Sequence, residues 1–147
     1  MTPNELRQTC LTLLAAQSNL QVWNGAPAES EPALGFGAGS LDVALDPDGR
    51  AHLYAALYVG SGWRTPEDDR LAGVSGTRVS TFQVTAAGGD IDRCLRAADK
   101  VLAALDGVLI ASGGVIRNDI DPGLPREDRD PKPSRYYLPL IFRVAIS

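Results

Sequence analysis

The sequence predicts an α+β fold, in which a mostly antiparallel, mixed sheet carries two packed helices and is accompanied by long loops. Residues 79–105 combine a strand, a Gly-Gly turn and an amphipathic helix, and residues 136–146 alternate as in a half-buried strand. The other strands are joined by hairpins and loops, which favours antiparallel pairing with helices on the sheet. With 147 residues, the chain is expected to form one domain, residues 1–147.

The first helix is expected to run from about Pro3 to Ser18. Thr2 and Glu5 have the spacing of a capping box, and proline is favoured at the first helical position. The apolar run inside this helix is broken by Thr12, so it is too short for a membrane span and we expect no membrane association. The expected buried side consists of Leu6, Cys10, Leu13 and Leu14.

A hairpin is expected in the first half of the chain. A short extended piece at residues 21–23 leads into an irregular connector, residues 24–40, which is rich in Gly, Pro, Ala and Glu. Apolar side chains then alternate over residues 41–45, and residues 46–49 have the Asp-Pro-Asp-Gly composition of a turn. Residues 50–59 are expected to return as the long partner strand.

The second helix has the clearest boundaries. Residues 80–86 alternate as a strand, and after Gly88 and Gly89 the side chain of Asp90 can cap a helix that ends before Gly107. Its spacing places one apolar stripe on the helix, which we expect to be buried. The members of this stripe are Ile91, Cys94, Leu95, Ala98, Val101, Leu102 and Leu105.

The C-terminal third is expected to contain a short hairpin and one long strand. Residues 108–110 and 115–117 flank a Gly-rich turn, and residues 118–135 form a stretch with four prolines and mixed charges. In the final strand, Pro139 suggests an edge or strand-start position because it cannot donate to a ladder. The expected inward-facing residues are Leu138, Leu140, Phe142, Val144 and Ile146.

A catalytic, metal or cofactor site is not evident in the sequence. The single histidine, His52, lies in a predicted strand on the face that it shares with Tyr54 and Tyr58. Cys10 and Cys94 each lie on the apolar stripe of a helix, so we expect buried free thiols in a reducing compartment. We therefore expect no enzymatic activity and no cofactor, and residues 46–49 to form a turn instead of a calcium loop.

Three segments resemble the tail terminator proteins of long-tailed bacteriophages, especially those of actinobacteriophages. The segments are RAHLYAALYVGSGW at residues 50–63, EDDRLAG at residues 67–73, and STFQVTAAGGDIDRCLRAADKVLAAL at residues 80–105. In that family an extended segment leads into a Gly-rich loop with a Trp and a "DR" pair, and a strand, turn and helix follow. The similarity covers roughly residues 50–107 and consists of packing and turn motifs.

Two polar loops are the candidate interaction surfaces. Residues 60–78 place a large aromatic side chain between a flexible Gly-Ser-Gly and opposite charges, and residues 118–135 carry balanced charges that can pair with a neighbour. The alternatives are a lid over the sheet edge for the first loop and a solvated connector for the second. The candidate residues are Trp63, Arg64, Asp68, Asp69, Arg70, Arg126, Asp128, Arg129 and Lys132.

The resemblance implies a structural virion protein, made in the host cytoplasm, that caps the completed tail tube as a ring and joins tail to head. The expected partners are further copies of the chain (a hexamer), the tail tube protein and a head-side connector. DNA would only pass through the lumen, and a net charge of −4 argues against tight binding to it. The alternatives are a head-side neck protein, or a small ligand-binding or enzymatic domain with its pocket under the Trp63 loop.

Overall fold

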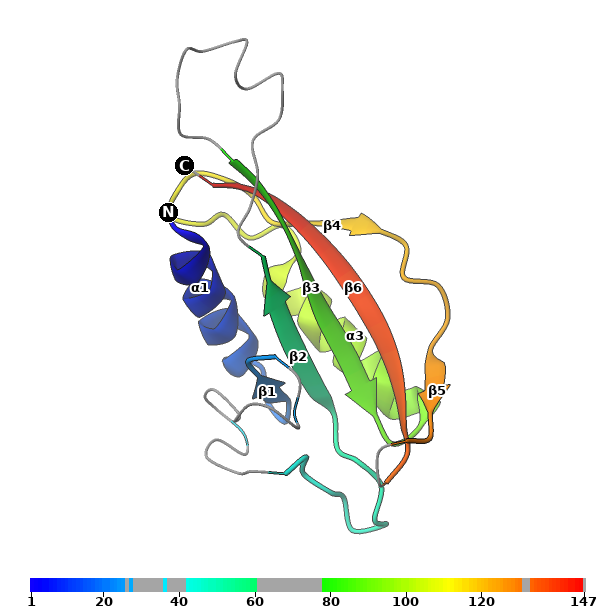
Figure 1. The fold of residues 1–147 in the computed structure, drawn as a ribbon. Helices are drawn as coiled ribbons and strands as arrows, with labels where there is room; N and C mark the ends of the chain where they lie inside the picture. The colour runs from blue at the N-terminus through cyan, green and yellow to red at the C-terminus, as the bar shows by residue number, and fades with distance from the viewer. Residues whose placement is uncertain (26, 28–35, 37–41, 61–77, 131–132, 147) are drawn as a thin grey trace, which may run out of the picture.

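The computed structural model describes residues 1–25, 27, 36, 42–60, 78–130 and 133–146 (Figure 1). Over these residues it contains two helices and a six-stranded mixed sheet, which confirms the α+β class. The helices are α1 (Pro3–Ala15) and α3 (Ile91–Leu105). The strands are β1 (Gln21–Trp23), β2 (Tyr54–Val59), β3 (Arg78–Gly88), β4 (Arg117–Ile120), β5 (Arg126–Asp128) and β6 (Arg135–Ile146).

The sheet is built around the long antiparallel pair β3 and β6. Its strand order is β1-β2-β3-β6-β4, and β5 also pairs with β6. Only β1 and β2 run parallel among the described strands. Pro139 lies in the interior of β6, so the predicted strand-start position is wrong, but it falls between the residues paired with β5 and those paired with β4. Among the described strands it is therefore paired only with β3, as at a sheet edge. A residue without an N–H disturbs the sheet least where one flanking strand is interrupted.

Both helices pack on the same face of the sheet and enclose the main core. The alternating residues of β6 from Leu138 to Ile146 are buried as predicted, and on β3 Phe82, Val84 and Ala86 face the same core. Phe82 and Phe142 are register partners, and their rings stack with centroids 5.4 Å apart. Burying side chains of this size contributes about 1.5–3 kcal/mol each.

A smaller cluster covers one end of the opposite face. Trp23 and Tyr54 are buried there against Ala87, with Val43 packed on them. The buried Gln21 side chain holds the covering segment, because its Oε1 accepts from Ala44 N at 2.9 Å and its Nε2 donates to Asp42 O at 3.2 Å. The rest of this face carries no described helix.

The N-terminal half departs from the sequence prediction in three ways. Helix α1 ends at Ala15 instead of Ser18, and Leu11 is buried in place of the only partly buried Leu13. The predicted hairpin is reduced to one bridge, between Leu45 and Ala51, and Leu45 is 56% exposed. The physical reason is that residues 42–44 pair with the Gln21 side chain, so β2 begins only at Tyr54.

Helix α3 has the predicted bounds but a rotated buried face. Ile91 and Leu95 are 50% and 44% exposed, and Leu102 is only partly buried. Ala97 and Ala104 are buried instead, because their small side chains let the helix lie close to the sheet. The predicted buried stripe was therefore wrong on one flank of the helix.

The stretch at residues 118–135 is also more ordered than predicted. It contains the end of β4 and all of β5, which pairs antiparallel with the first residues of β6. The expected hairpin before it is reduced to a bridge between Leu109 and Val115. The paired residues of β5 and β6 lie about ten positions apart in the chain. Over that separation, composition alone does not predict which residues pair.

Candidate functional site

The start of α3 packs closely against the turn at residues 46–50. Gly89 N donates to Ala51 O at 2.8 Å. A Cβ atom at Gly89 would lie 2.6 Å from the Arg50 Cβ and 2.7 Å from Ala51 N, so only glycine fits there. This close approach brings three aspartates together around the first turn of the helix.

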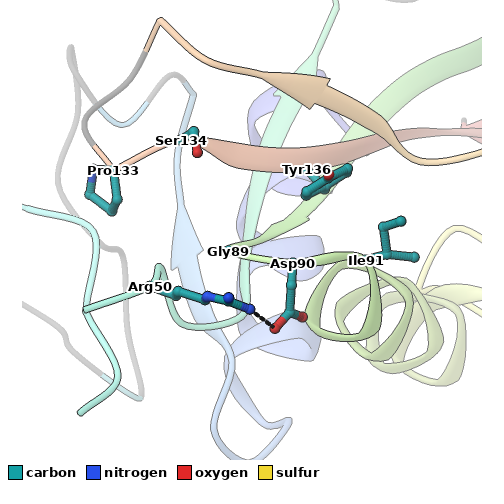
Figure 2. Close-up of a pocket in the computed structure, with 7 residues that line it drawn as sticks. All are labelled: Arg50, Gly89, Asp90, Ile91, Pro133, Ser134 and Tyr136. Atoms are coloured by element: carbon teal, nitrogen blue, oxygen red, sulfur yellow. Dashed lines mark hydrogen bonds and ion pairs between the residues drawn. The ribbon is translucent and has the colours of Figure 1, made fainter. Parts of the chain in front are cut away.

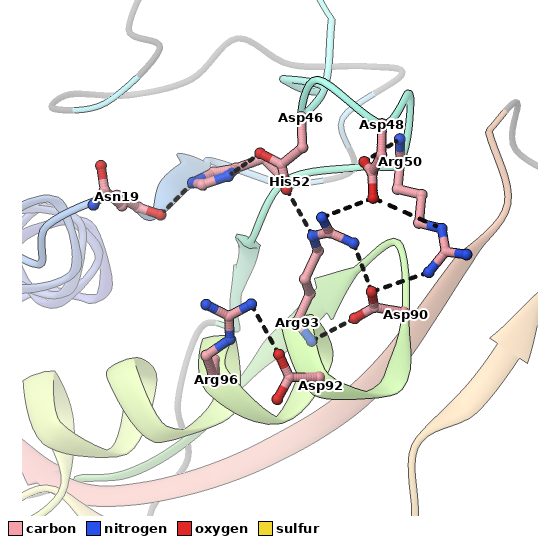
Figure 3. Close-up of polar contacts among 9 residues, drawn as sticks. All are labelled: Asn19, Asp46, Asp48, Arg50, His52, Asp90, Asp92, Arg93 and Arg96. Atoms are coloured by element: carbon pink, nitrogen blue, oxygen red, sulfur yellow. Dashed lines mark hydrogen bonds and ion pairs between the residues drawn. The ribbon is translucent and has the colours of Figure 1, made fainter.

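Arg93 binds all three of these aspartates (Figure 3). Its Nε lies 2.6 Å from Asp46 Oδ2, its Nη2 lies 3.0 Å from Asp48 Oδ2, and its Nη1 lies 2.5 Å from Asp90 Oδ2. Asp90 is also the N-cap, since its Oδ1 accepts from Arg93 N at 2.7 Å. Arg50 extends the cluster with a 3.3 Å contact from its Nη1 to Asp90 Oδ2. The Asp-Pro-Asp-Gly turn predicted from sequence is thus tied to α3 by ion pairs.

These contacts lower the pKa of all three carboxyl groups. For Asp46, burial alone raises the pKa, but the hydrogen bonds from His52 and Arg93 outweigh it. For Asp48, the hydrogen bond from the Arg50 backbone lowers the pKa most. For Asp90, burial again raises the pKa, and the Arg93 backbone N–H and guanidinium outweigh it. The cluster is therefore built to hold carboxylates in the ionised form.

His52 lies just before β2, not in a strand as predicted, and both of its ring nitrogens are engaged. Nδ1 lies 2.7 Å from Asp46 Oδ1, and Nε2 lies 2.6 Å from Asn19 O (Figure 3). A carbonyl oxygen can only accept, so the contact with Asn19 uses Nε2 as the donor. His52 therefore links the end of α1 to the turn at residues 46–49. Both of its ring nitrogens are used in these contacts, so neither is free to serve as a base.

A cavity of about 470 Å³ lies beside this cluster (Figure 2). It is lined by Arg50, Gly89, Asp90, Ile91, Pro133, Ser134 and Tyr136. The only histidine of the chain is held by Asp46 and Asn19, so it does not activate Ser134 or Tyr136. Within the described residues, no group of three or more His, Cys, Asp or Glu could hold a metal ion. Among the described residues that line the cavity, no hydroxyl group is paired with a histidine base.

The structure places three of the nine predicted interface residues. Arg126 and Asp128 belong to β5, and Arg129 follows it. Asp128 binds Arg135 of its own chain at 3.4 Å, and Arg129 binds Glu127 at 3.0 Å with the arginine side chain 82% exposed. The remaining candidates lie outside the described residues: Trp63, Arg64, Asp68, Asp69, Arg70 and Lys132. The three that are placed lie together along β5.

Arg135 anchors this corner of the sheet. Its guanidinium donates to the Tyr54 hydroxyl, and its central carbon lies 5.8 Å from the centre of the Tyr54 ring. Burial raises the pKa of Tyr54, so the hydroxyl remains protonated and can accept this bond. Sequence reasoning did not single out Arg93 or Arg135, because Asp46 lies 47 positions from the first and Tyr54 lies 81 positions from the second, which leaves no local signal.

Two arginines lie opposite each other on the sheet face that carries no described helix. We call the part of this face beyond the Trp23 and Tyr54 cluster the open part of the sheet. Arg117 of β4 and Arg143 of β6 are register partners, and both are exposed. Like charges directly opposite each other across strands are destabilising. The described part of the chain provides no ion pair to either arginine. Relative to the described residues, this surface therefore holds positive charge without a carboxylate partner.

Comparisons with known proteins add no family. No protein-family model matches the chain, and no curated protein matches it. None of the described helices is long and apolar enough to cross a membrane.

Proposed function

We propose that the protein is a tail terminator of a long-tailed bacteriophage, which caps the finished tail tube as a ring and provides the surface that joins the head. The observation that carries this proposal is the resemblance over residues 50–107, in which an extended segment, a Gly-rich loop and a strand–turn–helix follow in the family's order. Those residues include β2, β3 and α3, the centre of the fold.

The shape of the subunit supports a role in assembly. Its helices occupy one face of the sheet, while β1, β4 and β5 lie at the margins and part of the other face has no described cover (Figure 1). A ring of about six copies needs one surface that binds a different surface of the next copy, in contacts that close by rotation. A thin layered subunit with two unlike faces meets this requirement.

The proposed ring stops tube growth because its tail side mimics the next tube layer while its head side does not. The tail side would bind the tail tube protein, and the head side would bind a head-side connector, with DNA passing through the lumen. Trp63 and Arg126 are the first residues to test at these contacts, since Trp and Arg are enriched at binding hot spots. The protein would accordingly be found in the tail or neck of the virion.

The proposal is tested by deleting the gene from a phage genome that carries it and measuring tails by electron microscopy. The expected result is overlong tails, or tails without heads, with infectivity restored by the wild-type gene in trans. A His52→Gln gene should also complement if the variant folds, because the proposed function needs no catalytic side chain. Normal tails and full infectivity in the deletion would refute the function.

Trp63→Ala provides the finer test. If Trp63 is a hot spot, its loss should weaken joining by about 2 kcal/mol or more. Arg129→Ala is the matched control, because an exposed charge pair contributes only about 0–1 kcal/mol. Equal complementation by both variants would remove Trp63 from the interface.

A further inference from the structure

One flank of α3 carries apolar side chains that its own fold leaves uncovered. Ile91 and Leu95 are 50% and 44% exposed. Leu102 is only partly buried, and the spacing of these three residues places them on one flank. Asp99 lies one turn beyond Leu95, is exposed, and has no ion pair with any described residue. The flank is thus an apolar stripe beside an exposed carboxylate that no described residue pairs with.

The open part of the sheet has the complementary composition. Register places Tyr58, Gln83 and Ile141 in one row across β2, β3 and β6. The next row on the same face ends with Arg143 and Arg117. Tyr58 is 42% exposed and Ile141 is partly exposed. This face therefore presents apolar side chains next to two like charges that lack a described carboxylate partner.

We propose that these two surfaces bind each other between copies of the chain, so that the α3 flank of one subunit lies on the open sheet face of the next. This inference rests on the proposed function, because it names the contact that would close the ring. The partner is a second copy because both halves of the contact are on this chain, one acidic and one basic.

The spacings of the two surfaces match. Leu95 and Asp99 are four helical residues apart, about 6 Å along the axis. Ile141 and Arg143 are two strand residues apart, about 7 Å. A helix lying along β6 can therefore place Leu95 over Ile141 and Asp99 against Arg143. Since the surfaces differ, the contact is head-to-tail and can propagate around a ring.

A charge-exchange experiment on the purified full-length chain tests the contact. Arg143→Glu and Asp99→Arg should each weaken self-association at least about tenfold, because each one places like charges together. Mixing the two variants in equal amounts should restore association, since every contact in an alternating ring then joins opposite charges. The double variant should associate alone. Sedimentation velocity over a concentration series measures these four samples and wild type, with thermal midpoints confirming that each is folded.

Arg7→Glu is the matched control, because it reverses an arginine on α1, a helix that belongs to neither of the two proposed surfaces. It should associate like wild type. The inference is overturned if the two single variants associate like wild type, if the mixture stays dissociated, or if wild type remains monomeric at its solubility limit. None of these outcomes tests the proposed function itself. The deletion experiment tests it, because its readout is tail length, which does not depend on which surfaces of the subunits meet.

Discussion

Arg93 Nε lies 2.6 Å from Asp46 Oδ2, although the two residues are 47 positions apart. The contact fixes the turn before β2 to the first turn of α3, and Asp48 and Asp90 bind the same guanidinium. Arg93 and Asp46 are both mostly shielded from solvent, with 15% and 21% of their side chains exposed. Ion pairs in such a setting are screened less than surface pairs.

Arg93→Met should lower the thermal midpoint clearly at neutral pH, because it leaves three carboxylates close together without their shared partner. Arg96→Met is the matched control on the same helix. It removes only the exposed pair with Asp92, in which the side chains are 56% and 76% exposed, so little change is expected. Equal midpoints for the two variants would show that the cluster does not stabilise the fold.

The pH dependence of this difference has a definite sign. The folded pKa values of Asp46, Asp48 and Asp90 all lie below the ordinary value of 3.8. Groups with lowered folded pKa values stabilise the fold above their unfolded pKa, and the stabilisation is lost as pH falls through the folded pKa. The gap in thermal midpoint between wild type and Arg93→Met should therefore be constant near neutral pH and shrink below about pH 4. A gap that widens on acidification would contradict the assignment.

Gly89→Ala should destabilise the protein by about 1–3 kcal/mol, as overpacking does at a tight contact. The added Cβ would meet Ala51 N at 2.7 Å, and backbone cannot move aside as a flexible side chain can. Gly60→Ala is the control, since none of the described residues lies within 4 Å of its added Cβ and its φ is outside the left-handed range. It should be neutral or stabilise by up to about 1 kcal/mol. Urea unfolding measures both variants.

Truncations on α3 should report which face is buried. Leu105→Ala should cost about 2–5 kcal/mol, since Leu105 is fully buried in the core. Leu95→Ala should stay within about 0.5 kcal/mol in the isolated subunit, because Leu95 is 44% exposed. A cost for Leu95→Ala as large as that for Leu105→Ala would mean that the helix is rotated toward the face predicted from sequence.

The two thiols should be unreactive in the native protein. Burial raises the pKa of Cys10 to about 12 and that of Cys94 to about 11, from an ordinary value of 9.0. Only the thiolate attacks a disulfide reagent, so labelling with such a reagent at mildly alkaline pH should be negligible. Unfolding in urea should release both thiols. Rapid labelling of the folded chain would contradict their placement.

Arg143→Glu should raise the thermal midpoint of the dissociated subunit. The change replaces a like-charge pair opposite Arg117 with an opposite-charge pair, worth about 0.2–1 kcal/mol. Arg143→Lys keeps the repulsion and is the control. The measurement belongs at low protein concentration, where self-association does not contribute. A midpoint lowered by Glu and unchanged by Lys would show that the two side chains do not face each other.

Local signals in the sequence were sufficient for several elements. The capping box of Thr2 and Glu5 forms as predicted, with Thr2 N donating to Glu5 Oε2 at 2.6 Å. Helix α3 begins after Asp90, and Gly107 beyond its end has a φ of 82°. The alternation in β6 correctly separates its buried from its outward residues. Caps, turns and periodicity act between residues a few positions apart, so each can be read from a short segment.

Tertiary structure alone decided which partners these elements take. The Asp-Pro-Asp-Gly turn was predictable, but its binding to Arg93 was not. The apolar stripe of α3 is wider than the core requires, and only packing against the sheet selected Ala97 and Ala104 over Ile91 and Leu95. Periodicity specifies that a helix has an apolar side, but the exact buried face depends on the shape of the surface it meets. That surface is assembled from residues far apart in the chain, which no local pattern records.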